Sequence, residues 1–180
     1  MLFRSGDNIE AASHVPPVHT KSWFHTGVYR DLERISRQYE GEYYREPNLT
    51  DEDFQALLLP DTILPAGLTT LDEREACRAL KGMLLRQEVY ADDAGPDPPA
   101  TAIQRAATPY TVVERNFTIR TLQRRAGNRH GVFFAHPHEV ITYQYERNPV
   151  DPRIQHTLTL EVDEFGNILK TAAIGYGRRE

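Results

Sequence analysis

Residues 156–176 (HTLTLEVDEFGNILKTAAIGY) constrain the fold more than any other stretch of this chain. In the first half, apolar and polar side chains alternate with the period of two that places them on opposite faces of a strand. The apolar set is Leu158, Leu160 and Val162, and the polar set is Thr157, Thr159 and Glu161. Asp163, Gly166 and Asn167 then favour a turn, because glycine and asparagine tolerate positive φ and an aspartate side chain can cap it. The stretch therefore predicts a β-hairpin with a loop of about four or five residues.

Further strand patterns lie upstream of this hairpin, and we expect them to belong to the same sheet. They cover residues 84–90, 110–120, 130–135 and 139–146. Pro137 and His138 are expected to separate the last two strands. Residues 162–168 (VDEFGNI) also have the outline of a YD-type repeat unit, in which Tyr-Asp, two free residues and glycine start each strand pair.

Short helices are expected in the first half of the chain. One lies within residues 29–44, where apolar residues recur at helical spacing. A second has Thr50 as its N-cap and ends before Pro60, because proline cannot continue a helix. A third begins at Thr70, with Glu73 three residues further on in the capping-box pattern.

Two segments lack such patterns. Residues 1–21 are polar and predict an extended lead-in. Residues 92–109 contain four prolines and predict a mobile surface loop. Residues 22–180 are then one unit of α+β class in which β-structure dominates, with short helices in the N-terminal half followed by antiparallel strands and hairpins.

Composition and charge exclude several classes of protein. A net charge of -5 and a pI of about 5.8 argue against electrostatic binding to nucleic acid or anionic membranes. Residues 1–20 contain no apolar signal core, so classical secretion is not encoded in this chain. Cys77 is the only cysteine, which excludes an intramolecular disulfide, and without an activating pair it is expected to be a small buried hydrophobe.

No residue set predicts catalysis or a cofactor. The cluster of His136, His138 and Glu139 lacks a second pair of ligands, so a polar strand end is a better interpretation than a metal site. Two acidic pairs could serve acid–base chemistry, but their spacing is that of solvated surface charges. They are Glu42 with Glu46, and Asp151 with Glu161. The chain has no nucleophile elbow and no phosphate-binding glycine-rich loop.

Two other features have alternative interpretations. Trp23 and Phe24 either anchor the core, because aromatic rings bury large areas, or form an exposed docking patch. The basic groups are solvated turn charges, gatekeepers against strand pairing, or contacts to an acidic partner surface. They are Arg124, Arg125, Arg129, Arg178 and Arg179.

Seven ordered motifs resemble the middle region of the B component of insecticidal toxin complexes (TcB, of the TcdB/TcaC type). They are residues 22–27 (SWFHTG), 42–47 (EYYREP), 57–61 (LLLPD), 75–82 (EACRALKG), 85–90 (LRQEVY), 145–154 (YERNPVDPRI) and 160–179, which ends in GYGRR. The resemblance runs from about Lys21 to the end of the chain, and residues 1–20 and 92–109 do not match.

This resemblance implies a structural role. In that family the B component has an SpvB-like region and a β-propeller that docks on the pore-forming A component. The B and C components together build a hollow shell of Rhs/YD-type strands around the cytotoxic C-terminal segment of the C component. The region resembled here belongs to the shell wall, and both the toxic activity and the self-cleaving site belong to the C component. The resemblance implies no catalytic, cofactor-binding or metal-binding residues. It implies a structural role as repeat-motif residues for Asp163, Gly166, Asn167 and Tyr176.

The resemblance also sets expectations for partners and behaviour. The partners would be the remainder of the B component, the C component and indirectly the A component, in a toxin that is secreted or associated with the cell surface. Because the propeller and most of the shell are absent, we expect a partial chain that is marginally stable or self-associating. The alternative is a stand-alone protein-binding module that uses Trp23, Phe24 and an exposed strand face. An ADP-ribosylating enzyme is disfavoured, because its Arg, Ser-Thr-Ser and Glu-x-Glu signatures are not found.

Overall fold

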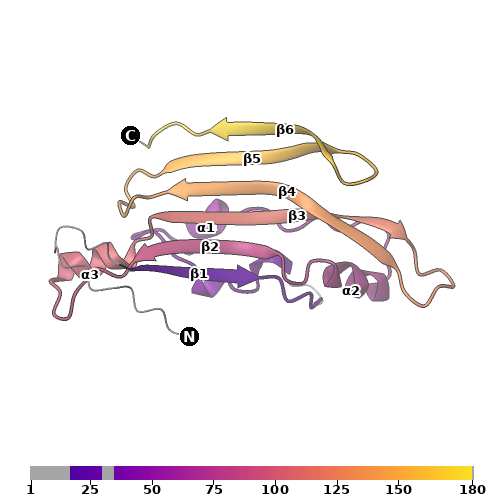
Figure 1. The fold of residues 1–180 in the computed structure, drawn as a ribbon, viewed down its shortest axis with the longest axis horizontal. Helices are drawn as coiled ribbons and strands as arrows, with labels where there is room; N and C mark the ends of the chain where they lie inside the picture. The colour runs from indigo at the N-terminus through magenta and orange to yellow at the C-terminus, as the bar shows by residue number, and fades with distance from the viewer. Residues whose placement is uncertain (1–16, 30–34, 180) are drawn as a thin grey trace, which may run out of the picture.

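The computed structural model describes residues 17–29 and 35–179, and its centre is one six-stranded antiparallel sheet (Figure 1). The strands follow one another across the sheet in chain order, as a meander. They are β1 (Val18–Phe24), β2 (Leu84–Ala91), β3 (Thr111–Gln123), β4 (Val132–Gln144), β5 (Arg153–Val162) and β6 (Ile168–Gly175). With a few short helices beside this sheet, the predicted β-dominant class is confirmed.

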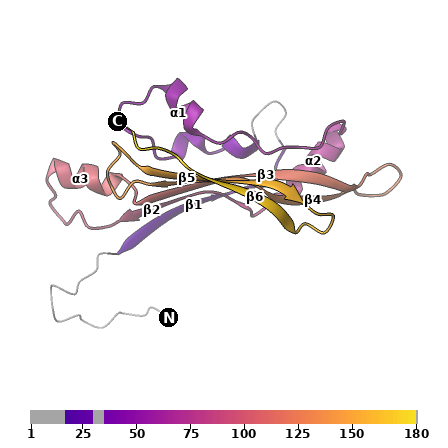
Figure 2. The same cartoon turned by 90° about the horizontal axis from the view of Figure 1, so that it is seen from above.

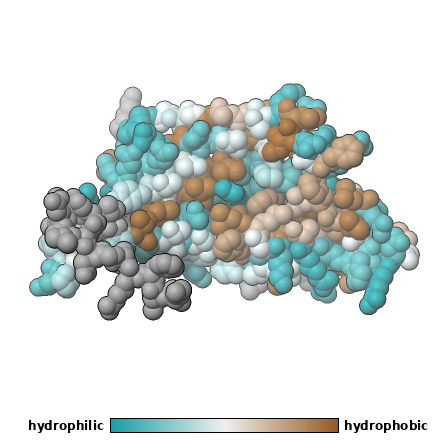
Figure 3. Space-filling view, viewed as in Figure 1, coloured by the Kyte–Doolittle hydropathy of each residue, from teal (hydrophilic) through white to brown (hydrophobic). Residues whose placement is uncertain are grey.

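The helical segments lie mainly between β1 and β2, in residues 25–83, which we call the insertion. It holds η2 (Ile35–Arg37), η3 (Glu40–Glu42), α1 (Asp51–Leu57) and α2 (Thr70–Arg78). Figure 2 shows that α1 and α2 lie on one side of the sheet, which we call the insertion face. The opposite side, the open face, is the one seen in Figure 3. No helix in the described ranges is long and apolar enough to cross a membrane.

The helix starts follow the expected capping chemistry. The Thr50 hydroxyl accepts a hydrogen bond from the Asp53 N–H at the start of α1. Helix α2 begins at Thr70 as predicted, but its capping box is formed one residue earlier than expected, by Thr69 and Asp72. The aspartate reaches back to the Thr69 N–H, so it replaces the predicted Glu73 in this role.

Two predictions about the helical segments are wrong. Among the described part of residues 29–44 the structure has two single 3-10 turns, η2 and η3, in place of one α-helix. The predicted loop at residues 92–109 contains helix α3 (Ala100–Ala107), because the alanine-rich sequence after Pro99 favours helix strongly. The remaining residues of that segment are irregular, and their mobility stays a prediction.

Strand β4 continues through Pro137, where a break was expected. Pro137 lies opposite Phe117 of β3, and the ladder skips His138 at a register irregularity. The pairing of β4 with β5 begins only at Glu139, so the missing N–H of Pro137 removes no bond to β5. A strand accepts proline at such an irregular position.

A buried polar cluster fixes the insertion to the sheet. Arg86 of β2 makes ion pairs with Glu88 at 2.8 Å and with Glu114 of β3 at 2.6 Å. The Tyr44 N–H donates to Glu88, and the Leu59 N–H donates to Glu114. Burial raises the pKa of Glu114, and the adjacent guanidinium opposes that rise. Each carboxylate therefore binds both the Arg86 guanidinium and a backbone N–H of the insertion. These contacts set the position of the insertion on the sheet.

Apolar clusters complete the core on the insertion face. Ala76, Cys77 and Leu80 are fully buried and belong to one cluster with Phe117 and Ile119 of β3. Burial raises the pKa of the Cys77 thiol to about 11, as expected of a thiol that acts as a small hydrophobe.

Candidate interaction site at the hairpin of strands β5 and β6

The loop joining β5 to β6 is built around one carboxylate. Asp163 Oδ1 accepts hydrogen bonds from the backbone N–H groups of Phe165 at 2.9 Å and Asn167 at 2.8 Å. Its Oδ2 accepts a third from the Asn167 side-chain amide at 2.8 Å. The bond from that amide, with the backbone donors, lowers the pKa of Asp163 below its ordinary value. The carboxylate therefore stays ionised and caps the turn.

Gly166 lets this loop lie close to the sheet. Its φ of +91° belongs to the left-handed region, and a Cβ at this position would overlap the ring of Phe134 on β4. On the neighbouring strand, Arg120 Nη1 donates to the carbonyl oxygen of Asp163 at 2.8 Å. Because Phe134 and Arg120 are cross-strand partners, the loop is held to β3 and β4 by a ring on one strand and a cation on the other.

Strand β6 ends the sheet and carries exposed apolar side chains on both faces. Leu169 is 60% exposed, Ile168 48% and Ile174 42%. Phe165, in the adjoining loop, is 80% exposed. In Figure 3 apolar colouring gathers over the turn end of β5 and β6. Within the described ranges β6 pairs with β5 alone, so one backbone edge of β6 has no strand beside it.

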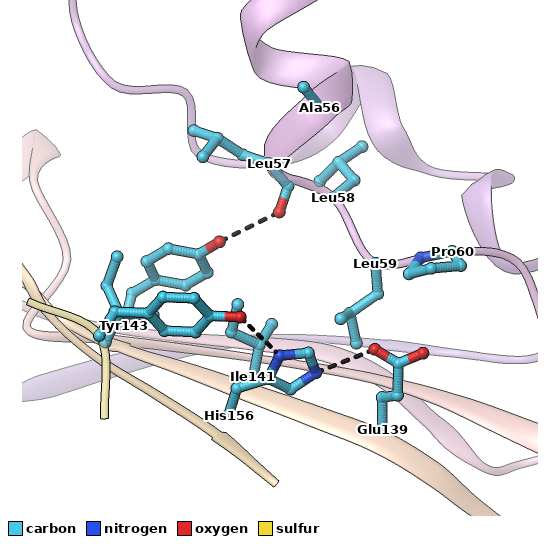
Figure 4. A pocket seen from close by; sticks show the side chains of 11 residues that line it. Ala56, Leu57, Leu58, Leu59, Pro60, Glu139, Ile141, Tyr143 and His156 are labelled. Carbon is cyan, nitrogen blue, oxygen red and sulfur yellow. Dashed lines mark hydrogen bonds and ion pairs between the residues drawn. The ribbon is translucent and has the colours of Figure 1, made fainter. Parts of the chain in front are cut away.

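A groove of about 430 Å³ lies beside this hairpin on the insertion face (Figure 4). One wall is the chain from Ala56 to Pro60, at the end of α1, and the floor comes from β4 and β5. Most of its surface is apolar, contributed by leucines of the wall together with Ile141 and Ile154. The Tyr143 hydroxyl donates to the carbonyl of Leu57 at 3.0 Å and so ties floor to wall.

Three polar side chains meet in this groove. His156 Nε2 lies 2.9 Å from Glu139 Oε2, and His156 Nδ1 lies 3.1 Å from the hydroxyl of Tyr176. The rings of His156 and Tyr176 stack with centroids 6.2 Å apart. The Asn116 side-chain oxygen accepts a hydrogen bond from the backbone N–H of Glu139 at 2.8 Å, which holds the backbone of Glu139 in place. This hydrogen-bond network links β3, β4, β5 and the residue just after β6. Its polar groups are bound to one another.

Sequence reasoning did not find the link from Glu139 to Tyr176. A signal was present, because His156 shares the alternating face of Leu158, where a histidine needs a partner when buried. The partner could not be identified from sequence, since Glu139 lies opposite Leu158 in the ladder, two residues away from Ile141, which is the ladder partner of His156.

The predicted histidine cluster on β4 does not converge on one point. His136 Nδ1 lies 3.0 Å from the carbonyl of Pro137, and His138 Nε2 lies 3.4 Å from Glu139 Oε1. In the ranges that the structure describes, no group of three or more His, Cys, Asp or Glu side chains is placed to hold a metal ion.

The two aromatic residues of β1 have different environments. Trp23 is 8% exposed, donates its indole N–H to Glu42 at 2.9 Å and packs edge-on against Tyr43. Phe24 is 48% exposed. A docking patch formed by both residues is therefore excluded, because Trp23 belongs to the core.

The C-terminal arginines bind carboxylates of this same chain. Arg179 forms a two-pronged contact with Glu46 at 2.6 and 3.0 Å. Arg178 Nε donates to Asp151 at 2.6 Å, and the Arg179 N–H donates to the same carboxylate. Glu46, expected to be a solvated surface charge, is 7% exposed and also accepts the Tyr145 hydroxyl. Arg178 and Arg179 therefore have carboxylate partners within this chain, and their contact with an acidic partner surface stays a prediction.

Comparison with known proteins places these features in a family. A family model described as the insecticide toxin TcdB middle/C-terminal region matches residues 75–180, which is more than half of the chain. The chain belongs to this family. No curated protein sequence matches it.

Solved toxin structures share the fold of this TcdB-family chain. The crystal structure of TcdB2-TccC3 is 28% identical with a TM-score of 0.72, and the match covers 96% of this chain and 8% of that one. The Tc holotoxin pore of Photorhabdus luminescens is 31% identical with a TM-score of 0.71, covering 93% and 7%. TcdB2-TccC3 without its hypervariable C-terminal region is 32% identical with a TM-score of 0.68, covering 92% and 7%. The chain thus spans less than a tenth of the length of these solved chains.

Proposed function

We propose that this chain is a non-catalytic wall segment of a toxin-complex B component. Its sheet would form part of the β-shell that, with the C component, encloses the cytotoxic C-terminal segment of the C component. The observation that carries the proposal is the free edge of β6, whose apolar side chains are exposed on both faces. An edge of this kind favours further strands beside it. The family match and the likeness to the TcdB2-TccC3 structures support the same conclusion.

In this proposal the hairpin of β5 and β6 is one unit of an Rhs/YD-type sheet. Asp163 fixes the loop by accepting three hydrogen bonds, and Gly166 allows the loop to lie against Phe134. These contacts curl the end of this strand pair back onto β3 and β4, the strands before it. A repeated unit with that geometry would give a sheet that curves, as the wall of a container must.

The proposed partners follow from this role. They are the remainder of the B component and the C component, and indirectly the pore-forming A component, within a secreted or cell-surface-associated toxin. We assign no cofactor, metal or catalytic residue, since the polar groups of the groove are engaged with one another. The buried position of Trp23 argues against a stand-alone binding module that uses Trp23 with Phe24.

A chimera tests the proposal. The segment of TcdB2 that aligns with this chain is replaced by residues 17–179, and the chimera is expressed with TccC3. We expect a complex that co-elutes in size-exclusion chromatography and protects the C-terminal region of TccC3 from protease. A matched chimera with Gly166→Val should assemble poorly, because the loop can no longer approach the sheet. A folded chimera that binds TccC3 but leaves that region open to protease would contradict the wall assignment.

A further inference from the structure

The hairpin of β3 and β4 extends beyond the strands beside it. Strand β2 pairs with β3 only as far as Glu114, and β5 pairs with β4 only from Glu139 onward. Between these two residues the hairpin continues as a two-stranded ribbon, residues 115–138, which we call the arm. Its turn projects past the ends of the other strands in both Figure 1 and Figure 2. The arm protrudes because its own strands are longer than the pairing of their neighbours.

Charge is distributed unevenly between the arm and the rest of the chain. All 26 acidic residues of the chain lie outside the arm, whereas five arginines lie within it. They are Arg115, Arg120, Arg124, Arg125 and Arg129. Since the chain as a whole has a net charge of -5, the arm is a local positive region on an acidic protein.

The three arginines of the turn have no carboxylate partner in the described part of the chain. No ion pair there involves Arg124, Arg125 or Arg129, and Arg124 reaches the carbonyl oxygen of Gly67 at 3.5 Å. Arg124 and Arg129 are exposed, and Arg125 is half-buried. In Figure 3 the end of the molecule that carries this turn has hydrophilic colouring. These charges can therefore pair with carboxylates of another molecule.

Local contacts hold the turn in one arrangement. The Asn128 side-chain amide donates to the carbonyl oxygen of Arg124 at 3.2 Å. Glu75 of α2 accepts the Gly131 N–H at 2.7 Å, and its other carboxylate oxygen lies 3.0 Å from His130 Nδ1. The Gly131 N–H, followed by His130, holds the pKa of Glu75 below its ordinary value, so this carboxylate stays ionised. A turn fixed in this way loses little conformational entropy when it binds a partner.

Aliphatic side chains adjoin the arginines. Leu122 is 57% exposed and Val132 is 46% exposed, whereas Phe133 and Ala135 of the same arm pack against the core cluster on the insertion face. Arginine beside exposed apolar groups is typical of surfaces that bind proteins. A nucleic acid backbone offers no apolar partner to Leu122 and Val132, and the net charge of the chain opposes the approach of nucleic acid or anionic membranes. These features favour a protein partner.

We propose that the arm is a docking element for an acidic surface of a partner protein. Arg124, Arg125 and Arg129 pair with carboxylates of that surface, since guanidinium and carboxylate form charge-assisted hydrogen bonds. Leu122 and Val132 contact apolar groups that lie between those carboxylates. This inference does not rest on the proposed function, because the wall assignment concerns the sheet and the docking element is a turn that projects beyond it.

Binding of an acidic peptide to the full chain tests the proposal. The probe is a fluorescein-labelled peptide of about ten glutamates interspersed with leucines, and fluorescence anisotropy measures its binding. Duplex DNA of the same charge and phosphatidylserine vesicles are the alternative anions. At low ionic strength we expect the chain to bind the peptide with a Kd of about 10 to 100 µM. Raising the ionic strength to about 0.15 M should weaken binding, because the Debye length falls to about 8 Å.

A matched pair of variants locates the site. The arm variant carries Arg124→Gln, Arg125→Gln and Arg129→Gln. The control loses the same charge from exposed cations in and just after α2, through Arg74→Gln, Arg78→Gln and Lys81→Gln. Both variants should keep the circular-dichroism spectrum of the wild-type chain. We expect the arm variant to bind the peptide at least tenfold more weakly and the control to bind it within about twofold of the wild type.

Three results would overturn the proposal. They are a wild-type chain that does not bind the peptide, equal weakening in both variants, and tighter binding of duplex DNA or vesicles than of the peptide. The last result would assign the arm to nucleic acid or to a membrane surface instead. None of these outcomes bears on assembly of the chimera with TccC3.

Discussion

Protonation of His25 should destabilise the fold between neutral and acidic pH. The side chain is 2% exposed, lies edge-on to Phe117, and neither ring nitrogen has a hydrogen-bond partner among the described residues. Burial lowers the pKa of His25 from 6.5 to about 4, although the charge of Asp61 acts in the opposite direction. The imidazole is therefore neutral in the folded chain over a range where the unfolded chain is protonated.

The sign and size of this effect follow from linkage. Above pH 6.5 both states hold a neutral ring, so the stabilisation from burial is fully present. As pH falls from 6.5 towards 4, only the unfolded state takes up the proton, and the free energy of unfolding decreases. This lowering of the His25 pKa corresponds to a loss of unfolding free energy on the order of 3 kcal/mol once the pH falls below both values.

Urea unfolding at pH 7.5 and 4.5 measures this loss. Carboxylates also titrate in this range, so the quantity to compare is the difference between the wild-type chain and His25→Leu. The leucine variant should lose about 2 kcal/mol less than the wild type between the two pH values. Parallel losses in both proteins would refute the assignment of a buried, unpaired imidazole.

Three further predictions concern stability and reactivity. Gly166→Ala should lower the free energy of unfolding by about 2 to 3 kcal/mol, because the new Cβ would overlap the ring of Phe134. The control Gly95→Ala also has a positive φ but open space around it, so it should lower the free energy of unfolding by only about 1 kcal/mol in the same urea assay. Arg86→Met should lower the free energy of unfolding by about 3 to 5 kcal/mol, because it leaves two buried carboxylates without their cation. An unchanged free energy of unfolding would show that these carboxylates are protonated or hydrated. Cys77 should react with a thiol reagent at pH 8 only as fast as the chain unfolds, and fast labelling of the native chain would contradict its burial.

The local part of this fold could be predicted from sequence. The hairpin of β5 and β6 depends on alternation and on Asp163 and Gly166, which lie within a few residues of each other. The start of α1 at Thr50 depends on a cap three residues long. Such signals need no knowledge of the rest of the chain, because the interacting groups are neighbours in sequence.

Long-range polar contacts could not be predicted in the same way. Glu46 and Arg179 are 133 residues apart, and their contact depends on where the insertion lies on the sheet. The pairing of Arg86 with Glu114 depends on the register of β2 and β3, which alternation alone leaves open. Pro137 was misinterpreted for the same reason, since only the ladder shows that it sits at an irregular position.

The insertion between β1 and β2 also bears on the order of folding. Strands β5 and β6 are joined by a short turn, whereas 59 residues separate β1 from β2. Closing a flexible segment of that length costs about 2 kcal/mol more in chain entropy than closing a five-residue turn. We therefore expect the meander from β2 to β6 to form first and β1 to join last. Because Trp23 lies on β1 and is the only tryptophan, its fluorescence would report the final step of folding separately from the growth of the sheet.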